Sequence, residues 1–338
     1  TSKLRLCFMF YNRIKNGAAP ILTQPLFVFG QLSCDRKIVT LCSNMSRTLY
    51  ITDMDGTLLG SDSRVSARSA AILAELSSLG AMVTVATART PATVVPLLKD
   101  CRLAIPAIVM TGAALWSRDT PQLPQYGEVE RCGHFEEVHY ICREDMDILD
   151  RAFREAGVYP FRYIRRTDAE ALTVFHSARM NAAERAFYEE RARLFLKRFE
   201  LQRPIGDEER ERCMLCFAMG EYGAIEKIGA VIARSTQCSY SLYPDTYDRS
   251  IGLLEVFGKG VSKASAVNRL RSRLDADRVI VFGDNLNDLP MMRCADVSIA
   301  VANALPEVRA AADIVIGSNS EDAVPRYIAA DYAKQQSR

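Results

Sequence analysis

The sequence predicts an α/β protein in which a doubly wound parallel sheet carries an inserted α+β domain. Short apolar runs alternate with amphipathic segments over residues 48–110, and the same alternation returns after residue 260. Strands alternating with helices are typical of a parallel sheet, whereas the apolar runs between these two parts come in pairs, which favours an antiparallel sheet. We therefore predict one core domain in two pieces, with an α+β domain between them: 45–116 and 257–338 for the core, 117–256 for the insert.

The first piece of the core predicts strand, helix, strand, helix, strand. The apolar residues Leu49–Ile51 form the first strand, and residues 66–79 carry leucine and isoleucine at helical spacing before a stop at Gly80. A strand over 82–86 follows, and Thr90-Pro91 is a good helix start because proline is favoured at the first helical position. The third parallel strand is expected at 107–110.

The insert is expected to contain helices and paired strands that together form a lid over the carboxyl edge of the core sheet. Its helices are predicted at 144–156, 182–199 and 221–234. Its strands are predicted near 159–164, 171–175, 213–219, 238–243 and 251–256. The last core strands then follow at 279–282, 297–301 and 314–316.

Composition excludes several classes of protein. A net charge of +2 argues against a dedicated nucleic-acid surface, and no apolar stretch is long enough to span a membrane. Ten cysteines without framework spacing indicate reduced thiols and a cytoplasmic protein; the one CxxC, Cys213 and Cys216, lacks further zinc ligands. Residues 1–44 are basic and irregular, and we expect either a non-native extension ahead of Met45 or a targeting segment. The oligomeric state has no signal in the sequence.

Polar groups follow several predicted strands at the edge where parallel sheets bind ligands. Asp53 and Asp55 follow the first strand, Thr87 the second, and Asp284 the strand at 279–282, while Lys263 begins a helix. One of the paired acids can attack a substrate while the other moves a proton. Carboxylates, a hydroxyl and a lysine together suit a phosphate ester and a Mg²⁺ ion.

The segment Asp284–Asp288 adds two acids and an amide at a helix entrance. Asp284 is expected to bind metal directly, Asp288 through water, and Asn287 to donate to phosphate. Helix capping by Asp284 or Asn285 is the alternative. For the other groups, the alternatives are an ordinary turn at Asp53-Met-Asp-Gly-Thr, a plain hydroxyl at Thr87 and a surface lysine at 263.

These motifs resemble the haloacid dehalogenase superfamily, and within it the Cof-type phosphatases with a large α/β cap. The resemblance covers residues 47–330 and implies a Rossmann-like core with the insert as its cap. Asp53-Met-Asp-Gly-Thr resembles the first motif, which implies Asp53 as nucleophile and Asp55 as general acid/base. Thr87, Lys263 and the segment 283–288 resemble the second, third and fourth motifs.

The resemblance implies a Mg²⁺-dependent phosphatase of small phosphorylated metabolites, with sugar phosphates as the expected substrates. Asp53 would form an aspartyl-phosphate that Asp55 helps water to hydrolyse. The implied metal set is Asp53, Asp55 through its carbonyl, Asp284 and Asp288; the implied phosphate-binding set is Thr87, Lys263 and Asn287. A phosphotransferase or mutase on the same scaffold and a non-catalytic binding or regulatory module are the competing hypotheses. The expected partner is a small phosphate ester, with no nucleic acid and no membrane.

Overall fold

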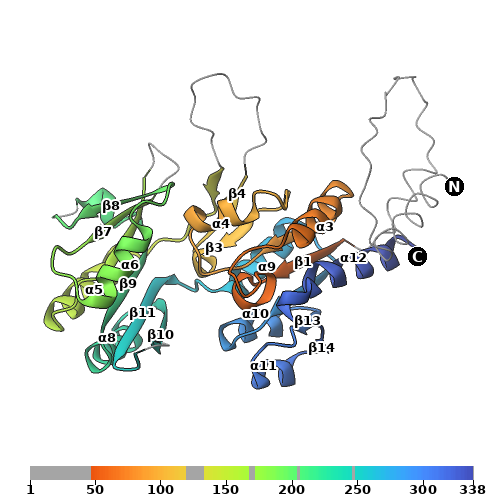
Figure 1. Ribbon diagram of the computed structural model, residues 1–338. Helices are drawn as coiled ribbons and strands as arrows, with labels where there is room; N and C mark the ends of the chain where they lie inside the picture. Colours follow the sequence, from red (N-terminus) through yellow and green to blue (C-terminus); the bar gives the residue numbers. More distant parts are fainter. Residues whose placement is uncertain (1–46, 119–132, 167–171, 204–205, 246–247, 338) are drawn as a thin grey trace, which may run out of the picture.

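The computed structural model describes residues 47–118, 133–166, 172–203, 206–245 and 248–337. The N-terminal extension predicted at 1–44 lies outside these residues. Within them the chain forms three sheets with five, six and three strands. Figure 1 shows the five-stranded and six-stranded sheets lying apart, with helices packed around each.

The five-stranded sheet is parallel throughout, which confirms the predicted fold class. Its strands, in spatial order, are β14 (Ile314–Val315), β13 (Val297–Ala300), β12 (Arg278–Gly283), β1 (Thr48–Thr52) and β2 (Met82–Val85). β1 lies between β12 and β2, with Ile51 opposite Val281 on one side and Thr84 on the other. All five residues of β1 are buried, because strands of a parallel sheet have both faces covered.

Helices cover both faces of this sheet. They are α3 (Ala67–Ser78), α4 (Pro91–Leu98), α9 (Lys263–Arg273), α10 (Leu289–Arg293), α11 (Pro306–Ala311) and α12 (Ala323–Gln336). Ser66 caps the start of α3, because its hydroxyl accepts a hydrogen bond from the backbone N–H of Ser69, 2.9 Å away. α12 packs against α3 and is anchored to β1 by Tyr50, whose hydroxyl donates to Asp331 at 2.8 Å.

The sequence predicts a parallel strand at 107–110, but the strand observed there does not join the parallel sheet. β3 (Ala107–Val109) pairs antiparallel with β4 (Ala114–Ser117), and β4 with β5 (His134–Glu136). A single parallel bridge, Ala86 to Ile108, links this small sheet to the end of β2. The chain reverses because Met110 and Thr111 have φ of +51° and +58° and Gly112 follows with +94°, which turns β3 straight back into β4.

The six-stranded sheet draws its strands from residues 161–259. In spatial order they are β10 (Cys238–Pro244), β11 (Ile251–Lys259), β9 (Cys213–Glu221), β6 (Phe161–Arg165), β7 (Leu172–His176) and β8 (Lys197–Leu201). All pairs are antiparallel except β7 with β8. Its helices are α5 (Arg143–Glu155), α6 (Ala182–Arg191), α7 (Asp207–Arg210) and α8 (Tyr222–Ser235).

The helix predicted at 182–199 is too long. α6 ends at Arg191, and the chain then forms β8, a strand that the sequence pattern does not predict. A parallel pair such as β7 and β8 needs a crossover connection, and α6 provides it. The many charged residues of this segment hide the usual alternation of a strand, because its one buried position is a lysine, Lys197, and the neighbouring positions are exposed or half-buried.

The two faces of the six-stranded sheet have different surroundings. Ile164, Cys216 and Leu254 face α5 and α8 and belong to a separate apolar cluster with these helices. Alternate residues of the same strands, such as Tyr163 and Phe217, join the apolar cluster of the core domain. Side chains of this second face are therefore directed toward the core.

Candidate active site

The turn after β1 brings two chain segments into close contact. The backbone N–H of Asp53 still donates to Phe282 at 3.0 Å, and the chain then turns through Gly56, whose φ is +80°. A Cβ atom on Gly56 would lie 2.9 Å from Cγ of Asp284. Glycine is therefore required both for the backbone conformation and for the approach of the Asp284 carboxylate. Asn303 fixes the turn by donating to the Gly56 carbonyl at 2.8 Å.

Three of the predicted groups meet in one buried ion cluster. Lys263 Nζ donates to Asp53 Oδ1 at 2.5 Å and to Asp288 Oδ1 at 2.8 Å. The exposed fractions are 4% for Lys263, 6% for Asp53 and 0% for Asp288, so the alternative of a surface lysine is wrong. Lys263 starts α9, where Ser262 caps the helix by accepting from the N–H of Ser265.

Burial and like charges shift the acid–base behaviour of this cluster. Desolvation raises the pKa of Asp53 to about 7 even though Lys263 lowers it, and Asp288 and Asp284 raise it further. Desolvation lowers the pKa of Lys263, but the two carboxylates raise it by more, so the lysine stays charged. Desolvation also raises the pKa of Asp284, while the hydroxyl of Thr57, 2.7 Å from Oδ1, lowers it. An additional cation would relieve this crowding of negative charge.

The residues present fit a Mg²⁺ ion. One oxygen each of Asp53, Asp284 and Asp288 lies within 4.8 Å of the others, and carboxylate oxygens are the ligands Mg²⁺ prefers. Both oxygens of Asp288 already have partners, because Oδ2 accepts from the backbone N–H groups of Asp284 and Asn285 at 3.1 and 3.2 Å. Asp53 and Asp284 are therefore better placed than Asp288 to bind an ion directly, while Asp288 accepts hydrogen bonds from the lysine and the loop.

Asp55 lies apart from this cluster and is held by an arginine that the sequence reasoning missed. Arg89 donates through Nε to one oxygen of Asp55 at 2.8 Å and through a terminal nitrogen to the other at 2.6 Å. The side chain of Asp55 is 54% exposed, so it faces the solvent at the mouth of the site. The hydrogen bond to Asp55 is the largest factor that raises the pKa of Arg89, and Glu190 of α6 adds to it.

Among the described residues, neither Thr87 nor Asn287 forms a side-chain hydrogen bond with the acids of the cluster. Thr87 is buried at the end of β2, and its hydroxyl accepts from the backbone N–H of Arg89 at 3.1 Å. Asn287 is exposed in the single 3-10 turn Leu286–Asp288, and within the described chain its side chain forms no hydrogen bond with the cluster. The capping alternative holds for Asn285, which accepts from the N–H of Leu286 at 2.7 Å, but not for Asp284.

Thr57, Arg89 and Asn303 are the further polar residues of this site. Thr57 is the last residue of the first motif and Arg89 lies two residues after Thr87, so their place in or beside the motifs is the signal that could have found them. Asn303 follows β13 and carries no such signal. All three act on groups already described: Thr57 on Asp284, Arg89 on Asp55, and Asn303 on the turn at Gly56.

The described cysteines and the lengths of the described helices add no chemistry to the site. The six described cysteines are free, and Cys213 and Cys216 have their sulfur atoms 3.8 Å apart in a buried position. No helix within the described ranges is long and apolar enough to cross a membrane.

Comparisons with family models and with individual sequences show which proteins this chain is similar to. The family model described as haloacid dehalogenase-like hydrolase matches residues 50–328. The chain is similar to a phosphoglycolate phosphatase of Methanopyrus kandleri, at 25% identity over 281 residues, which cover 83% of this chain and 95% of the relative.

Solved structures share the fold. One is a haloacid dehalogenase-like hydrolase from Bacteroides thetaiotaomicron, with a TM-score of 0.64 and 19% identity, covering 83% of this chain and 98% of that one. Another is described as a subclass IIB sugar phosphatase, with a TM-score of 0.60 and 19% identity, covering 85% and 99%. These findings confirm, at the level of the family, the predicted resemblance to Cof-type proteins with a cap. They also confirm the predicted class of enzyme, a phosphoric monoester hydrolase of the haloacid dehalogenase type. The chain belongs to the haloacid dehalogenase-like hydrolase family.

Proposed function

We propose that this hydrolase is a Mg²⁺-dependent phosphatase of small phosphorylated metabolites, with Asp53 as its nucleophile. The observation that carries the proposal is the buried contact of Asp53 with Lys263 at 2.5 Å, beside the carboxylate of Asp284. A carboxylate held by a lysine, with a second acid positioned for a cation, suits attack on an anionic phosphoryl group.

The chemistry follows from the positions of the side chains. A carboxylate oxygen of Asp53 forms a bond to phosphorus as the bond to the leaving oxygen breaks, and Asp55 gives that oxygen a proton. Asp55 then takes a proton from water, whose oxygen attacks phosphorus and breaks the bond to Asp53. Arg89 donates to both oxygens of Asp55, so one of these contacts has to open before the exposed Asp55 carboxyl carries the proton that it gives to the leaving oxygen.

The remaining residues hold the reacting groups. Lys263 orients Asp53 and offsets its charge, and Asp288 keeps Lys263 and the backbone after β12 in place. Asp53, Asp284 and the Asp55 carbonyl would hold Mg²⁺, which would supply positive charge for the approach of the carboxylate to the phosphoryl group. Thr87 and Asn287 remain our candidates for contacts with the phosphoryl oxygens.

The inserted unit, predicted as 117–256, is proposed to close over this mouth and to read the leaving group. The electrostatic influence of Glu190 on Arg89 supports this, because Glu190 belongs to α6 of the insert and Arg89 to the core. The names of the relatives support small substrates, one a phosphoglycolate phosphatase and one a sugar phosphatase. Sugar phosphates and a cytoplasmic location are the finer parts of the proposal.

The test is phosphate release from a panel of phosphorylated sugars, nucleotides, cofactors and phosphoglycolate, measured with Mg²⁺ and with a chelator. We expect Mg²⁺-dependent release, with loss of at least about a thousandfold in Asp53→Asn and unchanged folding by circular dichroism. Asp62→Asn is the matched control, since Asp62 is an exposed acid in the loop after the same turn. Full activity of Asp53→Asn would overturn the assignment, and transfer to added sugar without phosphate release would indicate a phosphotransferase.

A further inference from the structure

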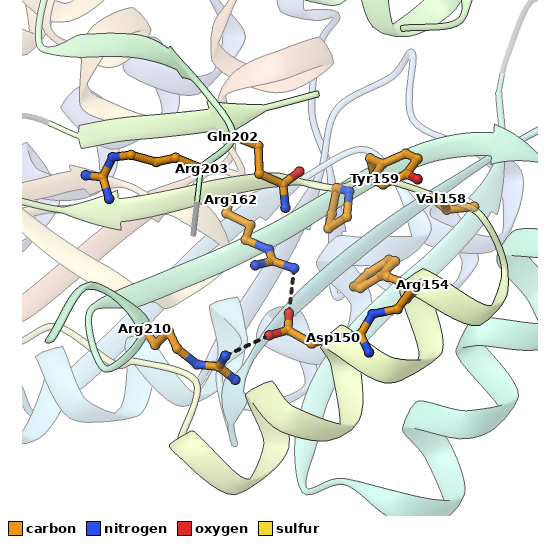
Figure 2. Close-up of a pocket in the computed structure, with 10 residues that line it drawn as sticks. Asp150, Arg154, Val158, Tyr159, Arg162, Gln202, Arg203 and Arg210 are labelled. Carbon is orange, nitrogen blue, oxygen red and sulfur yellow. Dashed lines mark hydrogen bonds and ion pairs between the residues drawn. The ribbon is translucent and has the colours of Figure 1, made fainter. Parts of the chain in front are cut away.

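A cavity of about 440 Å³ lies within the inserted unit, away from the acidic cluster. It is open to solvent on one side and is lined by residues of α5, the start of β6, the chain after β8, and α7 (Figure 2). Its lining residues are Asp150, Phe153, Arg154, Val158, Tyr159, Pro160, Arg162, Gln202, Arg203 and Arg210. The volume falls in the range of small-molecule sites, and none of the proposed catalytic residues takes part.

Arg162 is the central polar group of this cavity. It projects from the face of β6 that packs against α5, it is 7% exposed, and it donates to Asp150 Oδ1 at 2.5 Å. Its Nε is buried without a hydrogen-bond partner among the described residues. A buried guanidinium with an unused donor is costly unless a further acceptor satisfies it.

The cavity carries more positive than negative charge. Four arginines line it against one acid, Asp150, which is shared because Arg210 also pairs with it at 3.1 Å. On the outer side Arg210 pairs with Asp147 and Arg203 with Glu209. Arg154, at the end of α5, forms no ion pair with any described residue, so its charge remains available.

The other walls are apolar or amphipathic. Phe153, Val158 and Pro160 are buried, and Tyr159 places an exposed ring at the rim. In Figure 2 Gln202 reaches toward the same space from the chain after β8, opposite the helix that carries Asp150 and Arg154. A ligand bound here would contact arginine guanidinium groups on one side and apolar side chains on the other.

We propose that this cavity binds a small organic anion, whose phosphate or carboxylate group is held by Arg162 and Arg154 and whose body packs on Phe153 and Pro160. Planar guanidinium groups match both anions with paired hydrogen bonds. The site is separate from the proposed substrate site, because Arg162 and Tyr163 are neighbours on β6 that point to opposite faces of the sheet.

The test is isothermal titration calorimetry of the full chain, stripped of metal and then exchanged into chelator-free buffer, with benzoate and with phenylphosphonate as the two probes. Without a metal, the carboxylates around Asp53 repel anions, so binding there does not interfere. We expect one saturable site for at least one probe; the better probe shows whether the site prefers carboxylate or phosphate. Arg154→Gln and Arg162→Lys should each weaken binding by about tenfold or more, because each removes charge-assisted hydrogen bonds.

Arg151→Gln is the matched control, since Arg151 is exposed on the same helix and does not line the cavity. It should bind the probes as the unmodified chain does. Arg154 is itself exposed, so Arg154→Gln tests the site even if Arg162→Lys fails to fold. The proposal is overturned if neither probe binds by about 10 mM, or if Arg154→Gln and Arg151→Gln bind equally well.

Discussion

Replacing Lys263 with methionine tests the buried ion cluster most severely. Methionine keeps most of the side-chain volume, so the change removes charge and hydrogen bonds without opening a large cavity. It leaves Asp53 and Asp288, which are 6% and 0% exposed, without their shared cation. Breaking a buried ion pair in this way costs about 3–5 kcal/mol.

The expected cost lies at the lower end of this range. Asp53 already has a pKa of about 7, and loss of the lysine, which lowers that pKa, makes the carboxyl take up a proton more readily. We therefore expect Lys263→Met to lower the free energy of unfolding by about 3 kcal/mol above pH 7. The deficit should shrink as the pH falls, because protonation neutralises the uncompensated carboxylates.

The measurement is equilibrium unfolding by urea in the presence of a chelator, at several pH values. Lys259→Met is the control, since Lys259 is exposed at the end of β11 and its loss should change stability by less than about 0.5 kcal/mol. Adding Asp53→Asn to Lys263→Met should restore part of the stability, because one buried charge is removed. Equal stability of Lys263→Met and Lys259→Met at neutral pH would refute the reasoning.

Three further changes test other parts of the site. Arg89→Lys keeps the charge but loses the two-pronged contact with Asp55, so kcat/KM should fall by about ten- to a hundredfold in a phosphate-release assay; an unchanged value would remove Arg89 from the site. Gly56→Ala forces a methyl group against Asp284 at a positive φ, so we expect about 1–3 kcal/mol lower stability in urea and at least about tenfold lower kcat; normal values would contradict the packing. Desolvation raises the pKa of Glu255 to about 7, so the folded state binds more protons than the unfolded state from pH 4.5 to 7, and stability falls as pH rises through that window. Glu255→Gln should reduce that fall by about 1–2 kcal/mol in urea unfolding, and an identical pH profile would rule the residue out.

The sequence predicts the core of the site well because position along a strand determines position in the sheet. Asp53 and Asp284 follow neighbouring parallel strands, β1 and β12, so they lie at the same edge of the sheet. Lys263 joins them because the start of α9 lies at that same edge. The fold class and the gathering of Asp53 and Asp284 at one edge are therefore accessible from strand ends and spacing, whereas the direct contact of Lys263 with Asp53 is a finding of the structure.

Features that depend on side-chain direction or on a single backbone angle are not accessible in this way. The contact of Arg89 with Asp55 requires knowledge of both side-chain orientations, and Asn287 points to solvent although its neighbour Asp288 is fully buried. The reversal after β3 arises from positive φ at Met110 and Thr111, and these backbone angles cannot be predicted from the residue types. Apolar periodicity shows that a strand exists but not its direction, so β3 is predicted as parallel.

The central claim is that Asp53 attacks phosphorus. The most direct measurement mixes the enzyme with Mg²⁺ and the best substrate of the panel, stops the reaction with acid during turnover, and maps phosphorylated peptides by mass spectrometry. We expect a phosphoryl group on the Asp53 carboxylate, absent from Asp53→Asn. Turnover with the phosphoryl group on another residue, or undiminished turnover by Asp53→Asn, would contradict it.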